Sequence, residues 1–267
     1  MKSEDLSALE LCSAAHTAAL RAGEILVYGF TEAKVISTKS GVHNLVTQFD
    51  VASERAIVEC LLEQFPESTV LAEEGGGNEN PEGLRWIIDP LDGTVNFAHG
   101  VPIFSVSIAA EVNGVVTAGV VYQPLLNEMF RAARGHGAWC NDVPIGVSSQ
   151  TRLDHSLLVT GFPYEVAENA PHTMEFFSRL VSRGVPVRRL GSAAIDLAYV
   201  AAGRFEGFWE SALKPWDVAA GVLLVQEAGG NVSTFQGTPH TLSSPTILAT
   251  NSHIHSEFVT FLSQVSP

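Results

Sequence analysis

Two aspartates with two residues between them, Asp89 and Asp92, are the side chains of this sequence whose spacing most directly suggests chemistry. They follow an apolar run typical of a buried strand, and Pro90 stiffens the backbone between them. Carboxylates this close raise each other's pKa or require a cation. Gly93 and Thr94 come next, and their N–H groups can face an anion if a helix starts there. Because hard divalent cations take oxygen ligands and commonly lie beside a phosphate, the segment predicts a metal–phosphate site.

This prediction depends on further acids, because an Asp-x-x-Asp pair alone is most often a solvated turn or a helix cap. Three more acids have a matching context. Glu73 follows a short predicted strand, and Asp50 and Asp217 each open a predicted helix. An aspartate in the first turn also stabilises the helix dipole, so each acid by itself is explained as structural. Only the combination favours a function.

Hydrophobic periodicity places these acids in an ordered series of elements. The main predicted helices cover residues 6–29, 50–65, 170–183, 192–202 and 216–228. Residues 104–141 alternate as antiparallel strands do, whereas strands and helices alternate from about residue 148. Residues 31–48 are expected to be irregular and the glycine run 75–77 to be mobile. Strands grouped in the middle with helices on both sides favour stacked layers of sheet and helix.

Composition limits the functions open to the chain. Its 267 residues are 46% hydrophobic and 16% charged, which is typical of one globular domain or two closely packed halves. The formal charge of −14 argues against nucleic-acid binding, which relies on Lys and Arg. The same charge suits an anionic substrate only if cations intervene, in agreement with the predicted metal site.

Export and membrane insertion are not indicated. The first residues lack the basic-then-apolar order of a signal peptide, and no apolar run is long enough to span a bilayer. The cysteines, Cys12, Cys60 and Cys140, have neither metal-ligand nor disulfide spacing. We therefore expect a cytoplasmic protein with reduced cysteines and no membrane association.

Two long segments, residues 86–97 and 216–230, together resemble the signatures of the inositol monophosphatase family, a group of magnesium-dependent, lithium-sensitive phosphatases. Residues 45–50, 72–74 and 191–194 also fall where that family has matching residues. The resemblance runs from the first predicted helix to the end of the chain. Two long motifs in the right order are far more specific than one acidic pair.

The resemblance implies a fold class and a domain organisation. The expected class is α+β, a layered αβαβα sandwich of the sugar-phosphatase type. Residues 1–267 would form a single phosphatase domain. Its N-terminal α+β half, roughly residues 1–147, would carry the metal and phosphate loop, and its C-terminal α/β half, residues 148–267, the substrate pocket. A homodimer is expected on the same grounds.

The resemblance also implies a set of metal ligands. Glu73, Asp89 and the backbone carbonyl of Leu91 would hold one Mg²⁺, and Asp89 would bridge to a second held by Asp92 and Asp217. A third, weaker ion would lie near Glu73. The expected cofactor is therefore two to three Mg²⁺ ions, with Mn²⁺ as a substitute and with Li⁺ and Ca²⁺ as inhibitors.

Catalytic roles are implied for three side chains, Asp50, Glu73 and Thr94. The Thr94 hydroxyl, paired with Asp50, would orient and deprotonate the attacking water. The residues implied to face phosphate and substrate are Asp92, Gly93, Thr94, Gly191, Ser192, Ala193, Glu210 and Asp217. Lys39 would lie near the site entrance, and the segments 161–164 and 188–189 are candidates for specificity.

The predicted function is Mg²⁺-dependent hydrolysis of a small phosphate monoester by in-line attack of metal-activated water. Myo-inositol monophosphate is the first choice of substrate because Glu210 can accept hydrogen bonds from a polyol. Histidinol phosphate is the nearest alternative, since the same carboxylate suits an amine, and fructose 1,6-bisphosphate is the third. A hypothesis of another class is a regulatory protein that keeps the fold and binds a partner.

Overall fold

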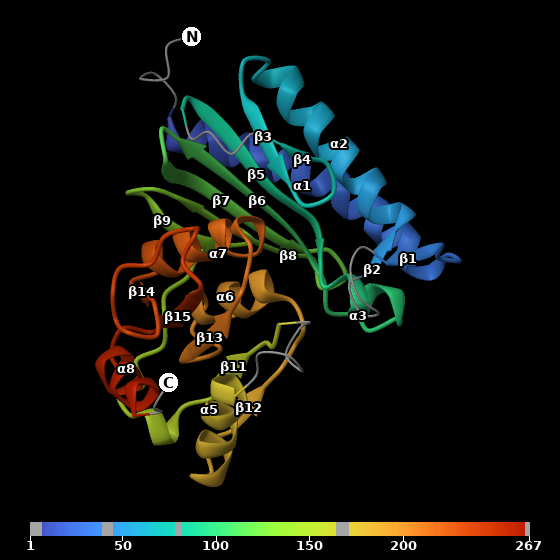
Figure 1. Ribbon diagram of the computed structural model, residues 1–267. Coiled ribbons are helices and arrows are strands. Elements are labelled where there is room, and N and C mark those ends of the chain that lie inside the picture. Colours follow the sequence, from blue (N-terminus) through green and yellow to red (C-terminus); the bar gives the residue numbers. More distant parts are fainter. Residues whose placement is uncertain (1–6, 39–44, 78–81, 164–170, 265–267) are drawn as a thin grey trace.

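The computed structural model describes residues 7–38, 45–77, 82–163 and 171–264. Within these ranges, layers of helix and sheet alternate in the order helices, large sheet, helices, small sheet, helices (Figure 1). The predicted α+β class and the αβαβα sandwich are therefore confirmed. No helix of the described ranges is long and apolar enough to cross a membrane.

The first layer is a pair of helices, α1 (Ala8–Thr31) and α2 (Gln48–Gln64). Small residues let α1 lie close to the large sheet, since a Cβ at Gly23 would be 2.4 Å from the ring of Tyr122. The buried alanines that share this face are Ala15, Ala18, Ala19 and Ala22. Alanines at this spacing supply the apolar stripe that the sequence predicts.

Between α1 and α2 the chain forms a short hairpin, β1 (Ile36–Thr38) and β2 (Leu45–Thr47). The expectation of an irregular segment was wrong here. Each strand has only three residues, and β1 is exposed along its whole length. A strand so short and so exposed leaves no alternation for a sequence pattern to detect.

The large sheet has the order β10-β9-β8-β7-β6-β5-β3-β4 and is antiparallel except for the β3–β5 pair. Its strands are β3 (Thr69–Ala72), β4 (Gly76–Gly77), β5 (Leu84–Asp92), β6 (Ser105–Val112), β7 (Val115–Gln123), β8 (Glu128–Ala133), β9 (Gly137–Cys140) and β10 (Val143–Pro144). The glycine run expected to be mobile pairs with β3 at the sheet edge, where Gly77 lies opposite Leu71. A Cβ at Gly77 would lie 2.0 Å from the Val70 carbonyl, so this close pairing requires glycine.

The middle layer is a second pair of helices, α6 (Ala193–Ala201) and α7 (Pro215–Glu227). It packs against the large sheet on one side and the small sheet on the other, so these helices are buried almost all round. The small sheet has the order β12-β11-β13-β15-β14. Its strands are β11 (Leu158–Thr160), β12 (Val187–Arg188), β13 (Gly207–Ser211), β14 (Asn231–Ser233) and β15 (Thr246–Thr250).

The outermost layer covers the far side of the small sheet with α5 (Pro171–Ser182) and α8 (His255–Ser263) (Figure 1). Two shorter elements complete the fold, α3 (Thr94–Ala98) and a single 3₁₀ turn (Leu153–His155). Because α6 and α7 lie between the sheets, their N-terminal ends can meet residues that end strands of the large sheet. The functional candidates gather at these ends.

Candidate active site

A bulge in β5 separates the two aspartates that opened the sequence argument. Asp89 lies opposite Ser107 and Asp92 lies opposite Ser105, so β5 has one residue more than β6 between these pairs. Pro90 occupies this interval, and it has no N–H to donate to the ladder. A bulge bends the strand and re-aims its side chains. The strand therefore continues through both acids instead of ending before them.

Asp89 lies at the centre of an acidic cluster. Its side chain is buried, and its Oδ1 accepts the Leu91 N–H at 3.0 Å. Burial raises the pKa of Asp89 well above its ordinary value, and the charges of Glu73, Asp92 and Asp217 raise it further. Four acids from three separate parts of the chain thus act on one another. The structure brings together the carboxyl side chains that the sequence singled out.

The same burial acts on the other acids of the cluster. It raises the pKa of Asp92 to about 6 and, with further repulsion from Asp92 and Glu73, the pKa of Asp217 to about 8. Protein donors offset part of this cost at Asp92, whose Oδ2 accepts the Ser192 hydroxyl at 2.6 Å and the Ala194 N–H at 2.8 Å. Asp217 Oδ2 accepts the N–H of Lys214 at 2.7 Å.

This donor set fits a hard divalent cation in kind, because it consists of one buried and three half-buried carboxylates whose mutual repulsion a cation would relieve. As the side chains lie, however, no three Asp, Glu, His or Cys residues of the described ranges form a ready ion-binding group. One oxygen of Asp92 and one of Asp217 are taken up by protein donors. Ligation would therefore use the remaining oxygens and small rotations of these side chains.

A hydrogen-bonded pair, Asp50 and Thr94, lies beside the cluster. Thr94 Oγ1 is 3.0 Å from Asp50 Oδ1 and 3.0 Å from the Leu91 carbonyl oxygen. The other oxygen of Asp50 accepts the backbone N–H of Thr47 at 2.8 Å and its hydroxyl at 2.5 Å. Asp50 is thus both a helix cap and a partner of Thr94. Burial raises the pKa of Asp50, against the opposing effect of these hydrogen bonds.

The turn that follows β5 requires glycine. Gly93 has a φ of +98°, a left-handed conformation, and opens the short helix α3. A Cβ at Gly93 would lie 3.0 Å from the Ile103 carbonyl oxygen and 3.3 Å from that of Gly191. The turn at Gly93 and Thr94 therefore packs directly against the loop that carries Gly191, Ser192 and Ala193.

Glu210, at the end of β13, is the next acid beyond the cluster. It is buried, and burial raises its pKa to about 8, with further contributions from Asp217 and Asp92. Its carboxylate packs against Gly161, where a Cβ would lie 2.1 Å from Oε2. Asp196 in α6 is a further buried acid. Burial raises its pKa well above the ordinary value, and the charges of Glu210 and Asp92 raise it further.

Comparison with known proteins identifies the family of the chain. The model of the inositol monophosphatase family matches residues 8–266. The chain belongs to this family. An inositol-1-monophosphatase from Synechocystis is 45% identical over 243 residues, which is 90% of this chain and 84% of that protein. A Pasteurella multocida protein named Nus factor SuhB is 41% identical over 244 residues, 91% of each chain.

Solved structures of the inositol monophosphatase family share the fold. The structure of inositol monophosphatase from Anabaena has a TM-score of 0.88 to this chain at 43% identity, and the match covers 97% of both chains. The resemblance stated from the two sequence segments is therefore confirmed. Membership in this family identifies the chain as a phosphatase homologue.

Several residues that organise the site in this family member were missed from the sequence. On α2, Ser53 donates its hydroxyl to the Pro90 carbonyl at 2.8 Å, and Glu54 accepts the N–H of Glu74 at 2.9 Å. Together with Asp50 they occupy one face of the helix at positions i, i+3 and i+4. The available signal was three polar residues at that spacing, on the face of a predicted helix that turns toward the core.

Other predicted positions do not join the cluster. Lys39 and Tyr164 lie outside the described residues. Arg188 and Arg189 are both exposed, and the Arg189 guanidinium lies 5.4 Å from the centre of the Phe162 ring. A cation over an aromatic face is a stable surface arrangement. The charge of Arg189 acts to lower the pKa of Glu210 and of Asp196, against the larger effect of burial. For both arginines the sequence allows a ligand of a second phosphate or a solvated surface charge, and this choice stays a prediction.

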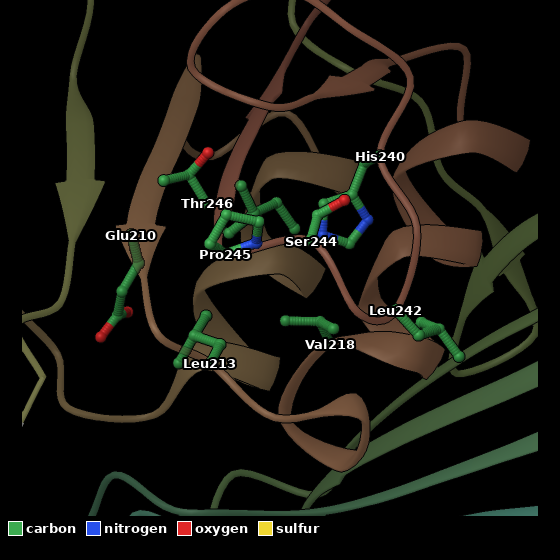
Figure 2. Close-up of a pocket in the computed structure, with 9 residues that line it drawn as sticks. Glu210, Leu213, Val218, His240, Leu242, Ser244, Pro245 and Thr246 are labelled. Carbon is green, nitrogen blue, oxygen red and sulfur yellow. The ribbon is translucent and has the colours of Figure 1, made fainter. Parts of the chain in front are cut away.

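A narrow pocket lies behind Glu210, between β13, the start of α7 and the segment before β15 (Figure 2). Figure 2 shows Glu210 and His240 on opposite sides of it, with Leu213 and Val218 below. The pocket is too narrow to hold a water molecule. Burial lowers the pKa of His240 to about 4, so this imidazole is neutral near pH 7. The pocket therefore serves as packing behind Glu210.

Proposed function

We propose that this protein catalyses Mg²⁺-dependent hydrolysis of a small phosphate monoester, with myo-inositol monophosphate as the first candidate substrate. One observation carries the proposal. The Thr94 hydroxyl lies within hydrogen-bonding distance of Asp50 and of the Leu91 carbonyl, at the edge of an acidic cluster centred on Asp89. Hydrolysis of a phosphate ester requires a buried base, a hydroxyl group and a set of cation ligands that lie side by side.

The metal ligands in this proposal are five groups that the cluster contains or adjoins. They are the carboxylates of Glu73, Asp89, Asp92 and Asp217 and the backbone carbonyl of Leu91. Bound Mg²⁺, in two to three ions, would neutralise charge on the transferring phosphoryl group and lower the pKa of a water molecule. Mn²⁺ would substitute, and Li⁺ and Ca²⁺ would inhibit.

The protein's own groups orient the nucleophile. Asp50 accepts the proton of the Thr94 hydroxyl, which leaves the Thr94 oxygen free to accept a proton from water. Glu73 would act on the same water. The water oxygen then forms a bond to phosphorus while the ester P–O bond breaks. One proton of this water passes to the Thr94–Asp50 pair, and the leaving oxygen takes up a proton from solvent water. The N–H groups of Gly93 and Thr94 bind the phosphate oxygens.

The leaving alcohol would meet the C-terminal half of the chain. Backbone groups of Gly191, Ser192 and Ala193 and the carboxylate of Glu210 would form its hydrogen bonds, with Asp92 and Asp217 facing the ester. Residues 1–147 and 148–267 would thus act as one domain, each half supplying one side of the substrate. Glu210 suits a polyol, and histidinol phosphate and fructose 1,6-bisphosphate are the alternatives.

The test is an assay of the three phosphates side by side, with Mg²⁺ and with a chelator. Turnover that requires Mg²⁺ and is fastest on myo-inositol 1-phosphate is expected. In parallel, Mg²⁺ at about a hundred times its dissociation constant should stabilise the fold by about 2.7 kcal/mol. Absence of Mg²⁺-dependent turnover on all three, together with a melting temperature that Mg²⁺ leaves unchanged, would contradict the proposal.

A second candidate function is partner binding of the regulatory kind, and a specific observation favours it. Relatives at 41% and 42% identity carry the name Nus factor SuhB. We propose that such a role would be additional to hydrolysis, since the acids of the cluster are all present. A complex of the purified chain with a transcription factor, retained by an inactive Asp89→Asn variant on size-exclusion chromatography, would support it. The same experiment reports whether the free chain is the expected homodimer.

A further inference from the structure

Asn96 forms a bridge between two segments that the proposed function assigns to different parts of the substrate. It lies in α3, two residues after Thr94. Its Nδ2 group donates to the Ile103 carbonyl and to the Leu190 carbonyl, each at 2.8 Å. Both amide hydrogens are therefore used, one within the N-terminal half and one across to the C-terminal half. Leu190 directly precedes the loop that carries Gly191.

The contact between these segments is tight on both sides of the bridge. Gly191 has a φ of +86°, and a Cβ there would lie 3.0 Å from Asn96 Nδ2. A Cβ at Gly93 would lie 3.3 Å from the Gly191 carbonyl oxygen. The turn at Gly93 and the loop at Gly191 thus meet backbone to backbone, and the Asn96 amide holds them at that separation.

A phosphate ester has a fixed distance between its phosphorus and the first hydroxyls of its alcohol. The turn at Gly93 and Thr94 would hold one end and the loop at Gly191 the other, so their separation must match the substrate. A misplacement of about 1 Å between such groups can cost roughly a hundredfold in rate. The loop has a second anchor, because Ser192 donates to Asp92 at 2.6 Å. Loss of the bridge would therefore loosen the loop without releasing it.

From this geometry we infer that Asn96 is a positioning residue for selectivity: it sets the spacing between the phosphate-binding turn and the loop that recognises the alcohol. Asn96 acts through Leu190 and Gly191 and touches no substrate. The inference rests on the proposed function and deepens it, because it names what matches the site to a polyol. It predicts an effect that depends on the leaving group.

The experiment compares two substrates in wild type and Asn96→Ala. Phenyl phosphate has an alcohol with no further hydroxyl groups, whereas myo-inositol 1-phosphate has five. Loss of two amide hydrogen bonds should raise KM for myo-inositol 1-phosphate by about tenfold. The value of kcat/KM for phenyl phosphate should stay within about twofold, because Asp50, Thr94 and the acidic cluster keep their contacts.

Asn251→Ala is the matched control. The Asn251 Nδ2 also forms two hydrogen bonds, to Ser148 Oγ at 3.0 Å and to the Gln150 carbonyl at 2.8 Å, and the residue is fully buried. Its loss should lower the melting temperature and leave the ratio of the two kcat/KM values unchanged. Asn96→Ser keeps one short donor, so its ratio of the two kcat/KM values should lie between those of wild type and Asn96→Ala. It replaces the alanine variant in the comparison if that variant does not fold.

Two results would overturn the inference. An equal loss on both substrates in Asn96→Ala and Asn96→Ser would show a merely structural role, and unchanged kinetics on both would show that the bridge has no effect. Failure of the proposed function looks different, because the wild-type protein would then hydrolyse neither phosphate. If wild type hydrolyses phenyl phosphate and prefers histidinol phosphate to the inositol ester, the preferred ester takes its place in the same comparison.

Discussion

The proposed phosphate side and the proposed leaving-group side of the candidate site are built in different ways. On the phosphate side, residues 89–97 form one continuous bulge, turn and helix, held from behind by Asp50 and Ser53 of α2. The leaving-group side draws Gly161, the loop after Leu190, and Glu210 from three separate elements. Local sequence defines the first side, whereas packing of distant segments defines the second.

This difference predicts a division of labour. On the proposed phosphate side, Asp50, Asp89 and Thr94 would act on the reacting atoms, so changes to these three residues should lower kcat on every ester. The proposed leaving-group side would contact only the alcohol, so changes there should alter KM and selectivity. The variants below test this division, from the largest expected effect to the smallest.

Asp89→Asn should abolish turnover, with a loss of at least about ten-thousandfold in kcat for all esters. Asparagine keeps the Oδ1 that accepts the Leu91 N–H and removes a charge that burial and its acidic neighbours oppose. The metal-free fold should therefore be retained, with a native circular dichroism spectrum. Asp154→Asn, at an exposed ion pair with Arg152, is the control and should be fully active. Activity of Asp89→Asn at saturating Mg²⁺ would refute the central role of this acid.

Thr94→Val should lower kcat by about a hundredfold or more while KM changes little, because valine keeps the shape and removes the hydroxyl of the proton relay. The loss should be equal on phenyl phosphate and on the inositol ester. Thr117→Val, which removes a hydroxyl bonded only to the Val115 carbonyl in the described contacts, is a suitable control. A loss confined to the inositol ester would break the proposed division, since Thr94 would then act on the alcohol.

Glu210→Gln should reduce kcat/KM for the inositol ester by about tenfold and leave phenyl phosphate within about twofold, because an amide replaces one acceptor oxygen with a donor. Steady-state kinetics on both esters measure the ratio. An equal effect on both would extend the phosphate side to include Glu210 and erase the contrast between the two regions.

The same variant has a pH-dependent effect on stability. Burial raises the pKa of Glu210 from 4.5 to about 8, so the folded state binds a proton that the unfolded state has lost between these values. The contribution of Glu210 to stability is fully present below pH 4.5. Above that, the free energy of unfolding falls by about 1.4 kcal/mol per pH unit up to pH 8. Metal-free Glu210→Gln should therefore match wild type near pH 4.5 and be more stable near pH 8. If the free energies of unfolding of wild type and Glu210→Gln differ by the same amount at every pH in this range, the raised pKa of Glu210 is contradicted.

Much of the fold followed from sequence patterns. Apolar periodicity placed the helices within a few residues, as for α2, predicted over 50–65 and observed over Gln48–Gln64. Short or glycine-rich strands were missed, namely β1, β2 and β4. β1 is exposed along its length, β4 consists of glycine, and β2 has only three residues, so none of them shows an alternation of buried and exposed side chains. Only pairing with a partner strand defines them.

The candidate site also has a part that the sequence predicted and a part that it did not. The acids and the glycine turn could be chosen from two motifs, and the structure places Asp89, Asp92 and Asp217 within electrostatic reach of one another. The residues that hold the acids and the glycine turn in place could not be predicted from the sequence. Asn96 and Leu190 are separated by 94 residues, and Ser53 and Pro90 by 37. A hydrogen bond over such a separation depends on how layers pack, and no local pattern encodes it.

The sequence by itself determined the layered α+β class, the family, and the acids and glycines of the two signatures, because these depend on residue type and on spacing along one element. The tertiary structure decided which acids share one buried cluster, that Asp50 reaches Thr94 while capping α2, and that Asn96 holds two loops together. The physical reason is that burial and mutual repulsion, which raise the pKa of Asp89, arise only when the layers close around it.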